Sequence, residues 1–221
     1  LSRLVQDTDL AALDAELKLA EGDYLALARQ ISQKRQTAAA ELSTKVTGLL
    51  HSLAISGEFE VNVSLTDNWT ANGIDNIQYL VCFNQGMTLQ PLNKVASGGE
   101  LSRVALALYV TLSINNPPEL IVFDEIDVGI GGGVAEVVGT LLRQLGISKQ
   151  VICITHQPQA ACCGDQHILV QKQSKSGQTQ ATIEYLDQER RVGEIARMLG
   201  GINITATTTS HAQEMLSGII K

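Results

Sequence analysis

Three short stretches of this chain place polar groups where a phosphate or an attacking water could meet them. The first, Ser97-Gly98-Gly99-Glu100-Leu101-Ser102-Arg103, stands directly before the apolar segment 104–110, whose residue types favour a buried helix. Free N–H groups and the positive end of the dipole at a helix start favour an anion, and glycine lets the backbone approach it closely. The stretch is a candidate phosphate site; a serine-capped helix after a tight turn is the structural alternative.

The second and third stretches are apolar runs that end in polar residues. Residues 119–125 end in Asp124 and Glu125, and residues 150–156 end in Thr155 and His156. Each run is typical of an inner parallel strand covered on both faces, and open α/β sheets bind ligands at the carboxyl ends of such strands. There an aspartate can help to hold Mg²⁺, a glutamate can position or deprotonate water, and a histidine can donate to a phosphate oxygen. Taken alone, the first run could be a buried strand that meets a polar loop, and the histidine of the second run could be structural. The three stretches in this order favour phosphoryl transfer.

Length and composition bound what surrounds these stretches. The 221 residues are 44% hydrophobic, which is enough for one sizeable core in a globular protein. The net charge of −7 and the pI near 5.1 argue against a broad nucleic-acid surface on this chain. The sequence contains no apolar run of membrane-spanning length, so we expect no membrane contact and a cytoplasmic location. It opens on Leu1 rather than Met, which suggests a piece of a longer protein.

The cysteines and histidines do not predict a metal centre. None of the four cysteines forms a CxxC pair, so a metal cluster or a disulfide framework is disfavoured, and the four histidines are too scattered to indicate a zinc site.

A long helix is predicted over residues 10–53. Its apolar positions follow the alternating three-and-four spacing of a heptad, without proline and with Gly22 as the main weak point. We interpret it as one strand of an antiparallel coiled coil whose other strand is missing from this chain. Lys34 and Arg35 occupy positions where the heptad pattern requires an apolar residue. The alternative, an amphipathic helix packed on its own domain, therefore stays open.

The rest of the chain has the pattern of an α/β domain. Strands are predicted at 58–65 and 76–83 around a turn-rich stretch, 66–75, in which Trp69 is either an exposed contact or, as we prefer, a half-buried anchor. Helix 134–145, between the two motif strands, indicates a doubly wound unit.

The C-terminal part adds a short helix, an edge hairpin and two more helices. The short helix is predicted at 158–164, and strands at 167–172 and 180–186 form the hairpin. Helices follow at 188–199, capped by Asp187, and at 205–220. The charged residues of the first of these are predicted to form a solvated face.

Taken together, the motifs resemble a known family. The order SGGELSR, LIVFDE and ITH resembles the signature motif, Walker B motif and switch histidine of ATP-binding-cassette (ABC) ATPases, in the variant of SMC-like chromosome and repair proteins. The strings VASGGELSR, FDEIDVGIGGG, ITHQPQ and ARMLGG are closer still to the members that act in bacterial DNA repair. The resemblance runs over residues 92–201; the first two motifs are specific, and the last two support them by position.

This resemblance implies a fold and a domain division. The fold is the C-terminal lobe of an ABC-type (P-loop NTPase) ATPase head, an α/β fold with a mainly parallel sheet flanked by helices and an N-terminal coiled-coil helix. Residues 1–53 would form one strand of the coiled-coil arm, and residues 54–221 the lobe with the signature, Walker B and switch-histidine motifs.

The most informative absence is that of a GxxxxGK[ST] sequence, the Walker A loop that cradles phosphates. In the family this loop lies in the N-terminal half, and two heads sandwich ATP so that the signature motif of one faces phosphates held by the other. The resemblance therefore implies ATP and Mg²⁺ as cofactors. It implies as partners the N-terminal half of the same protein, a second head in an ATP-sandwiched homodimer, and DNA through the full-length protein. We expect an ATPase acting in double-strand break repair and recombination, and no hydrolysis by this fragment alone.

Individual roles carry over by residue. The resemblance implies nucleotide contacts from Ser97, Gly98, Gly99, Glu100 and Asp124, with Asp124 supporting Mg²⁺ through water, and catalytic roles for Glu125 and His156. Gly131 stands where many cassette ATPases have the aspartate of the D-loop, which leaves the role of that position open. Asp127, the nearest acid, is a candidate for a cross-interface or water-positioning role.

Two alternatives stay open. One is a non-catalytic cassette-fold scaffold for dimerisation, which the intact Asp124-Glu125 pair disfavours. The other is a different SMC-like chromosome-maintenance ATPase; the long heptad helix ahead of the signature motif disfavours a transporter.

Overall fold

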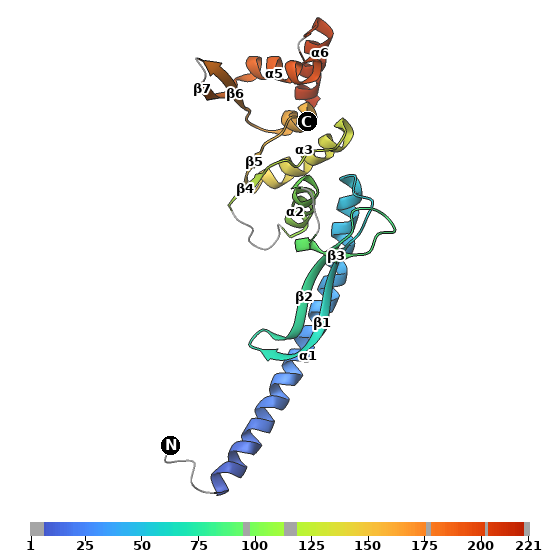
Figure 1. The fold of residues 1–221 in the computed structure, drawn as a ribbon, viewed down its shortest axis with the longest axis vertical. Helices are drawn as coiled ribbons and strands as arrows, with labels where there is room; N and C mark the ends of the chain where they lie inside the picture. Colours follow the sequence, from blue (N-terminus) through green and yellow to red (C-terminus); the bar gives the residue numbers. More distant parts are fainter. Residues whose placement is uncertain (1–6, 95–97, 113–118, 176–177, 202, 219–221) are drawn as a thin grey trace.

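The structure, a computed structural model, describes residues 7–94, 98–112, 119–175, 178–201 and 203–218. Their elements in chain order are α1 (Asp7–Ser52), β1 (Phe59–Thr70), β2 (Gly73–Val81), β3 (Gln90–Pro91), a 3₁₀ turn (Leu92–Lys94), α2 (Gly98–Leu112), β4 (Leu120–Phe123), α3 (Gly132–Gly146), β5 (Gln150–Cys153), α4 (Pro158–Cys163), β6 (Ile168–Lys175), β7 (Gln178–Tyr185), α5 (Gln188–Gly200) and α6 (Ala206–Gly218). The molecule is elongated, with α1 projecting from one end and the β6–β7 hairpin with α5 and α6 at the other (Figure 1).

The long helix predicted from the heptad spacing is present as α1, and its two halves differ. Leucines of the first half are exposed, with Leu10 and Leu13 each at 51% and Leu17 at 57%. At the other end Val46 and Leu50 are fully buried against the rest of the chain. The second half therefore packs on its own domain, as the alternative interpretation held, while the leucines of the first half stay exposed in the described part of the chain.

The β1–β2 hairpin lies along α1 (Figure 1). The predicted turn-rich stretch 66–75 is wrong: β1 continues to Thr70, with a register shift after Leu65, and β2 begins at Gly73. Contacts with α1 stabilise this longer hairpin. Trp69 stacks on Tyr24 of α1, with the ring centroids 5.4 Å apart. Trp69 is 47% exposed and anchors the hairpin, as preferred, although from a strand rather than a loop.

A buried ion pair adds to this brace. The Asp75 side chain is completely buried; it accepts hydrogen bonds from Ser32 Oγ at 2.6 Å and Arg35 Nη1 at 2.8 Å. The bond from Ser32, then that from Arg35, hold the pKa of Asp75 below its usual value.

The predicted strand–helix–strand unit is confirmed. Strands β4 and β5 pair in parallel, with Phe123 opposite Cys153, and α3 connects them. Among the described residues the parallel sheet consists of these two strands, whereas β1-β2-β3 and β6-β7 are antiparallel sheets.

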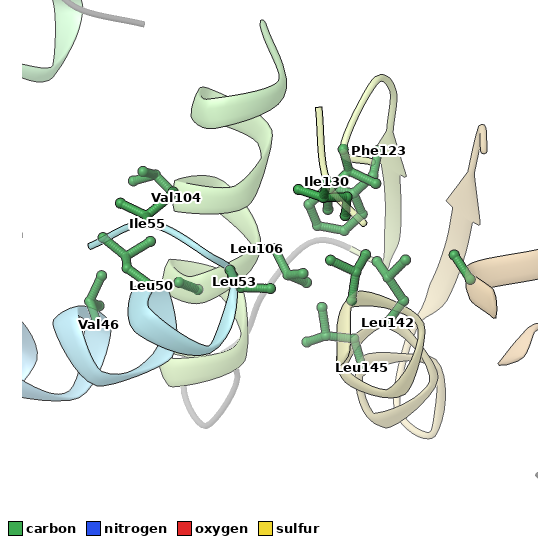
Figure 2. Close-up of a cluster of buried hydrophobic side chains, with 14 of the residues drawn as sticks. Val46, Leu50, Leu53, Ile55, Val104, Leu106, Phe123, Ile130, Leu142 and Leu145 are labelled. Atoms are coloured by element: carbon green, nitrogen blue, oxygen red, sulfur yellow. The ribbon is translucent and has the colours of Figure 1, made fainter. Parts of the chain in front are cut away.

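The main core lies between the end of α1, α2, β4 and α3. Figure 2 shows its side chains meeting from these elements. They include Val46, Leu50, Leu53, Val104, Leu106, Phe123, Ile130, Leu142 and Leu145, all buried. A smaller cluster joins α4, α5 and α6 through Cys162, Ile195, Ala196, Ala212 and Leu216. The site described below stands at the carboxyl ends of β4 and β5, next to the main core.

The charged face predicted for α5 is only partly solvated. Asp187 caps the helix as predicted by accepting from the backbone N–H of Arg190 at 2.9 Å. Arg191 and Glu194, however, are each only 8% exposed. The Arg191 guanidinium donates to carbonyl oxygens at the end of α4, among them Cys162 O at 2.9 Å, and so satisfies groups that a helix C-terminus leaves without partners.

Among the described residues, one face of the parallel pair carries exposed apolar side chains. Ile121 and Phe123 point into the core, whereas Val122 and Ile154 are each 55% exposed. We expected strands covered on both faces, and this chain covers one. None of the described helices is long and apolar enough to cross a membrane.

Candidate functional site

The two acids stand at the carboxyl end of β4, as predicted. Asp124 and Glu125 follow Phe123 directly, and both are exposed. Glu125 has a φ of 56°, in the left-handed region that non-glycine residues seldom adopt. The backbone thus turns sharply at the acid, a strained conformation of the kind that is often found at functional sites.

The glycines of the first motif lie against this turn. Gly98 and Gly99 begin α2, while Ser97 lies outside the described residues. A Cβ at Gly99 would lie 3.0 Å from the Glu125 carbonyl oxygen, and one at Gly98 would lie 2.8 Å from Glu125 Oε2. Glycine matters most at Gly99, where the neighbouring atoms belong to the backbone, whereas the flexible Glu125 side chain could move away from a Cβ at Gly98. Glu100, half-buried, stands in the first turn of the helix.

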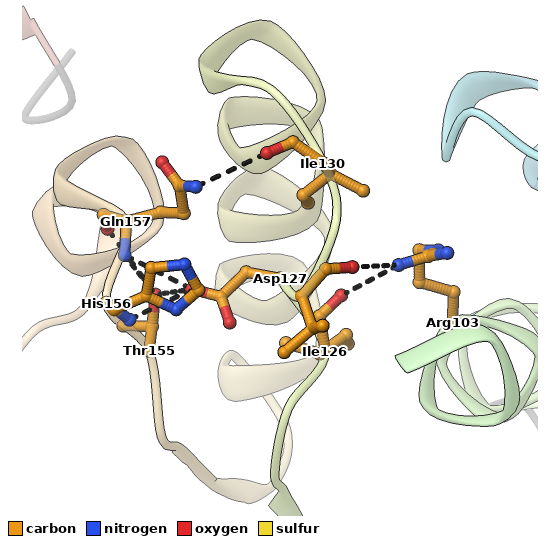
Figure 3. Close-up of polar contacts among 8 residues, drawn as sticks. Arg103, Ile126, Asp127, Ile130, Thr155, His156 and Gln157 are labelled. Carbon is orange, nitrogen blue, oxygen red and sulfur yellow. Dashed lines mark hydrogen bonds and ion pairs between the residues drawn. The ribbon is translucent and has the colours of Figure 1, made fainter. Parts of the chain in front are cut away.

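Two further residues of the same motif hold the loop after β4. Ser102 Oγ donates to the backbone oxygen of Asp124 at 2.9 Å. Arg103, 7% exposed, donates through Nη1 to Val128 O at 3.1 Å and Ile126 O at 3.5 Å (Figure 3). Burial lowers the pKa of Arg103, and the negative charge of Glu100 opposes that shift.

No individual role was predicted for Ser102 or Arg103 from the sequence. The sequence does contain a signal for Arg103, which is a cation directly before the apolar part of the helix. An arginine there is seldom buried without hydrogen-bond partners, so its position indicates that such partners exist.

Asp127 is the centre of the site, and its side chain is only 1% exposed. Its Oδ2 accepts hydrogen bonds from Thr155 Oγ1, from His156 N at 3.0 Å and from Gln157 N at 3.2 Å (Figure 3). The side chain points inward and joins the loop after β4 to the loop after β5. Oδ2 is therefore occupied by donors of the same chain, and the suggested cross-interface or water-positioning role of Asp127 stays a prediction.

His156 follows β5 as predicted, with 65% of its side chain exposed. Its Nδ1 lies 3.4 Å from Asp127 Oδ2. Because β4 and β5 are parallel and in register, His156 and the acid pair emerge at the same edge of the sheet. Cys153, the last residue of β5, lies near these acids. Burial, which has the largest effect, and the negative charges of Asp127 and Asp124 raise the pKa of its thiol to about 12.

The segment between β4 and α3 contains two glycines, Gly129 and Gly131, that differ in their backbone and surroundings. Gly129 has a φ of 75°, and Gly131 is the N-cap residue of α3, which has no side-chain cap. A Cβ at Gly131 would have no atom within 4 Å, so the space there does not require glycine.

The donors of this site fit part of a magnesium shell. The described residues contain no group of three or more His, Cys, Asp or Glu side chains that could hold a metal ion. Mg²⁺ is commonly bound through one or two carboxylates, with phosphate oxygens and water completing the shell. The exposed carboxylate of Asp124 suits that partial role.

The chain is similar to known proteins along nearly all of its length, although no family model matches it. It is 41% identical over 212 residues to DNA repair protein RecN of Vibrio cholerae, a match that covers 95% of this chain and 38% of that protein. RecN of Haemophilus influenzae is 44% identical over 194 residues, or 86% of this chain and 35% of the relative.

The chain is RecN-like. The resemblance expected from the motifs is thereby confirmed, and the chain spans well under half the length of the RecN relatives it matches.

A solved structure supports the fold. The Smc head domain with a coiled coil and joint from Pyrococcus yayanosii matches with a TM-score of 0.51 and 16% identity, over 85% of this chain and 35% of that one. The predicted fold class is confirmed: the chain has the fold of part of an Smc head domain.

Proposed function

We propose that this chain is the C-terminal part of a RecN-like SMC-family ATPase that acts in DNA double-strand break repair and recombination. The observation that carries the proposal is the meeting of three motif ends at one edge: α2 begins, and β4 and β5 end, around the Glu125 turn. The similarity to RecN supports the biological role. ATP binding and hydrolysis in the full-length protein would drive engagement of two heads.

Each residue has a distinct role in this proposal. Glu125, exposed on its turn, accepts a proton from the attacking water, and His156 donates to the γ-phosphate. Asp124 holds Mg²⁺ through water, and the ion supplies charge neutralisation of the phosphates. The start of α2 faces the nucleotide of the second head with Gly98, Gly99 and Glu100, and Ser97, just ahead of the described helix, is proposed to contact the same nucleotide.

The missing Walker A loop is supplied by the N-terminal half. The exposed apolar face of β4 and β5 and an open groove of about 270 Å³ between α2 and β4 support this pairing. Such exposed apolar surface is typical of an interface. Without that half we expect no ATP hydrolysis by the 221-residue chain.

The remaining partners follow from the same proposal. A second head completes an ATP-sandwiched homodimer, and the exposed leucines of α1 pair with the returning coiled-coil strand. DNA is bound by the full-length protein outside this acidic chain, whose net charge is −7. The protein acts in the cytoplasm at the nucleoid.

The test compares Glu125→Gln with wild type in the full-length protein. Because general-base catalysis contributes typically 10²–10⁴-fold, we expect turnover to fall by at least about 100-fold while ATP binding and head dimerisation persist. Glu119→Gln, an exposed acid just ahead of the same strand, is the matched control and should turn over normally. Unchanged turnover in Glu125→Gln would refute the assignment, and nucleotide-dependent dimerisation without wild-type turnover would favour the scaffold alternative.

A further inference from the structure

Several hydrogen bonds between two loops of the site converge on one buried oxygen atom. Asp127 Oδ2 accepts from one hydroxyl and two backbone N–H groups of residues 155–157, and the His156 ring stands beside the same atom. Resting on the proposed function, we infer that Asp127 is a positioning residue for ATP hydrolysis: it fixes the imidazole of His156 relative to Glu125.

The geometry explains why the residue must be a carboxylate. Three donors converge on one oxygen in a site that is 1% exposed, and an ionised acceptor makes stronger hydrogen bonds than a neutral one. An asparagine amide has the same shape but less charge, and turned the wrong way it would point N–H groups at N–H groups. Asn is therefore the substitution that alters the bonding with the least change in volume.

The same carboxylate orients the ring. With Nδ1 3.4 Å from Asp127 Oδ2, a proton on Nδ1 faces the acid, and Nε2 is left for the side of the ring away from it. The backbone bond to His156 N fixes the Cα position of the same residue. Asp127 thus determines both where the ring stands and which nitrogen faces the acid.

The loop that carries Asp127 is itself held from two sides. Arg103 of α2 donates to the carbonyls on either side of Asp127, at Ile126 and Val128, and Gln157 Nε2 donates to Ile130 O at 3.3 Å (Figure 3). Glu125 belongs to the same short loop. A displacement of Asp127 would consequently change the distance between the water-activating acid and the phosphate-sensing ring, and a misplacement of about 1 Å can cost roughly 10²-fold in rate.

A double-mutant cycle on turnover tests the inference in the full-length protein with ATP and Mg²⁺. We expect Asp127→Asn to lower kcat by about 10- to 100-fold with little change in KM, because positioning acts on the reacting geometry. In a His156→Ala background the same substitution should cause no further loss, since the ring that it positions is gone. An equal loss of kcat in both backgrounds would overturn the inference.

Two variants keep the test decisive. Asp75→Asn removes another buried, doubly hydrogen-bonded carboxylate, on the α1 brace, and should leave kcat unchanged even if stability falls. If Asp127→Asn does not fold, Thr155→Val removes one donor to Asp127 at constant size, and its smaller loss of kcat should likewise disappear in the His156→Ala background. If His156→Ala alone leaves turnover unchanged, the proposed role of His156 fails together with the inference; additive losses refute the inference alone.

Discussion

Arg103→Met should loosen both loops of the site at once. Arg103 is the residue by which α2 holds the carbonyls on either side of Asp127, and Met fills a similar volume without any donor. The carbonyls of Ile126 and Val128 then lose their partner, and the hold on the residue 155–157 loop weakens through Asp127.

The magnitude follows from the two bonds. A buried carbonyl left without a donor costs about 1–3 kcal/mol, and the 3.1 Å bond to Val128 counts for more than the 3.5 Å bond to Ile126. Burying the guanidinium is itself unfavourable, as the lowered pKa of Arg103 indicates, and Met removes that cost. We expect a net local loss of about 1–3 kcal/mol, which raises the opening equilibrium roughly 5- to 150-fold.

Amide hydrogen exchange of the full-length protein measures this opening directly. Peptides that cover 124–130 and 154–158 should exchange faster in Arg103→Met by that factor. The matched control is Arg143→Met, which removes a half-exposed arginine that donates to a backbone carbonyl, Cys163 O at 3.2 Å, away from these loops. Unchanged exchange at 154–158, or the same increase in the control, would refute the reasoning.

Four further substitutions or conditions test packing elsewhere in the chain. Because the folded-state pKa of Asp75 is lowered, its contribution to stability is complete above the unfolded pKa of about 3.9 and is lost as pH falls below it. Trp69 fluorescence should therefore report an acid transition of the hairpin that Asp75→Asn shifts or removes. Gly139→Ala should destabilise the protein by about 1–3 kcal/mol in thermal unfolding, because the new Cβ would lie 2.7 Å from a cysteine sulfur on α4. Gly22→Ala, with open space around it, should stabilise α1 by up to about 1 kcal/mol. The Cys153 thiol, with a pKa of about 12, should resist iodoacetamide at pH 8 until the protein is denatured, as read by mass spectrometry.

Each of these has a clear contrary result. An acid transition identical in wild type and Asp75→Asn would show that the buried pair does not set the response. Equal stability changes in the two glycine variants would mean that α3 and α4 are not closely packed at Gly139. Rapid alkylation of native Cys153 would contradict its burial beneath the acid loop.

Much of the site was predictable from the sequence because its signals are local. The short apolar runs that end in Asp124-Glu125 and in His156 indicate parallel strands, and parallel strands in register bring their carboxyl ends together. The Gly98-Gly99 start of α2 followed from the residue types around it. The match to RecN confirmed the family that these motifs suggested.

Tertiary contacts decided what lay beyond a residue's own segment. The strand β1 extends through a polar stretch because α1 lies beside it, with Tyr24 stacked on Trp69, and strand propensity depends on such neighbours. Arg191 is buried because the end of α4, far away in sequence, presents carbonyls that need donors.

The sequence alone determined the chemistry of the motifs and the edge of the sheet where they meet. Only the tertiary structure decided that Asp127 turns inward to bind residues 155–157 while Asp124 and Glu125 stay exposed. Three acids within four positions look alike in a sequence. Their roles separate only when the fold brings donors to one of them, because a buried carboxylate requires hydrogen-bond partners and an exposed one does not.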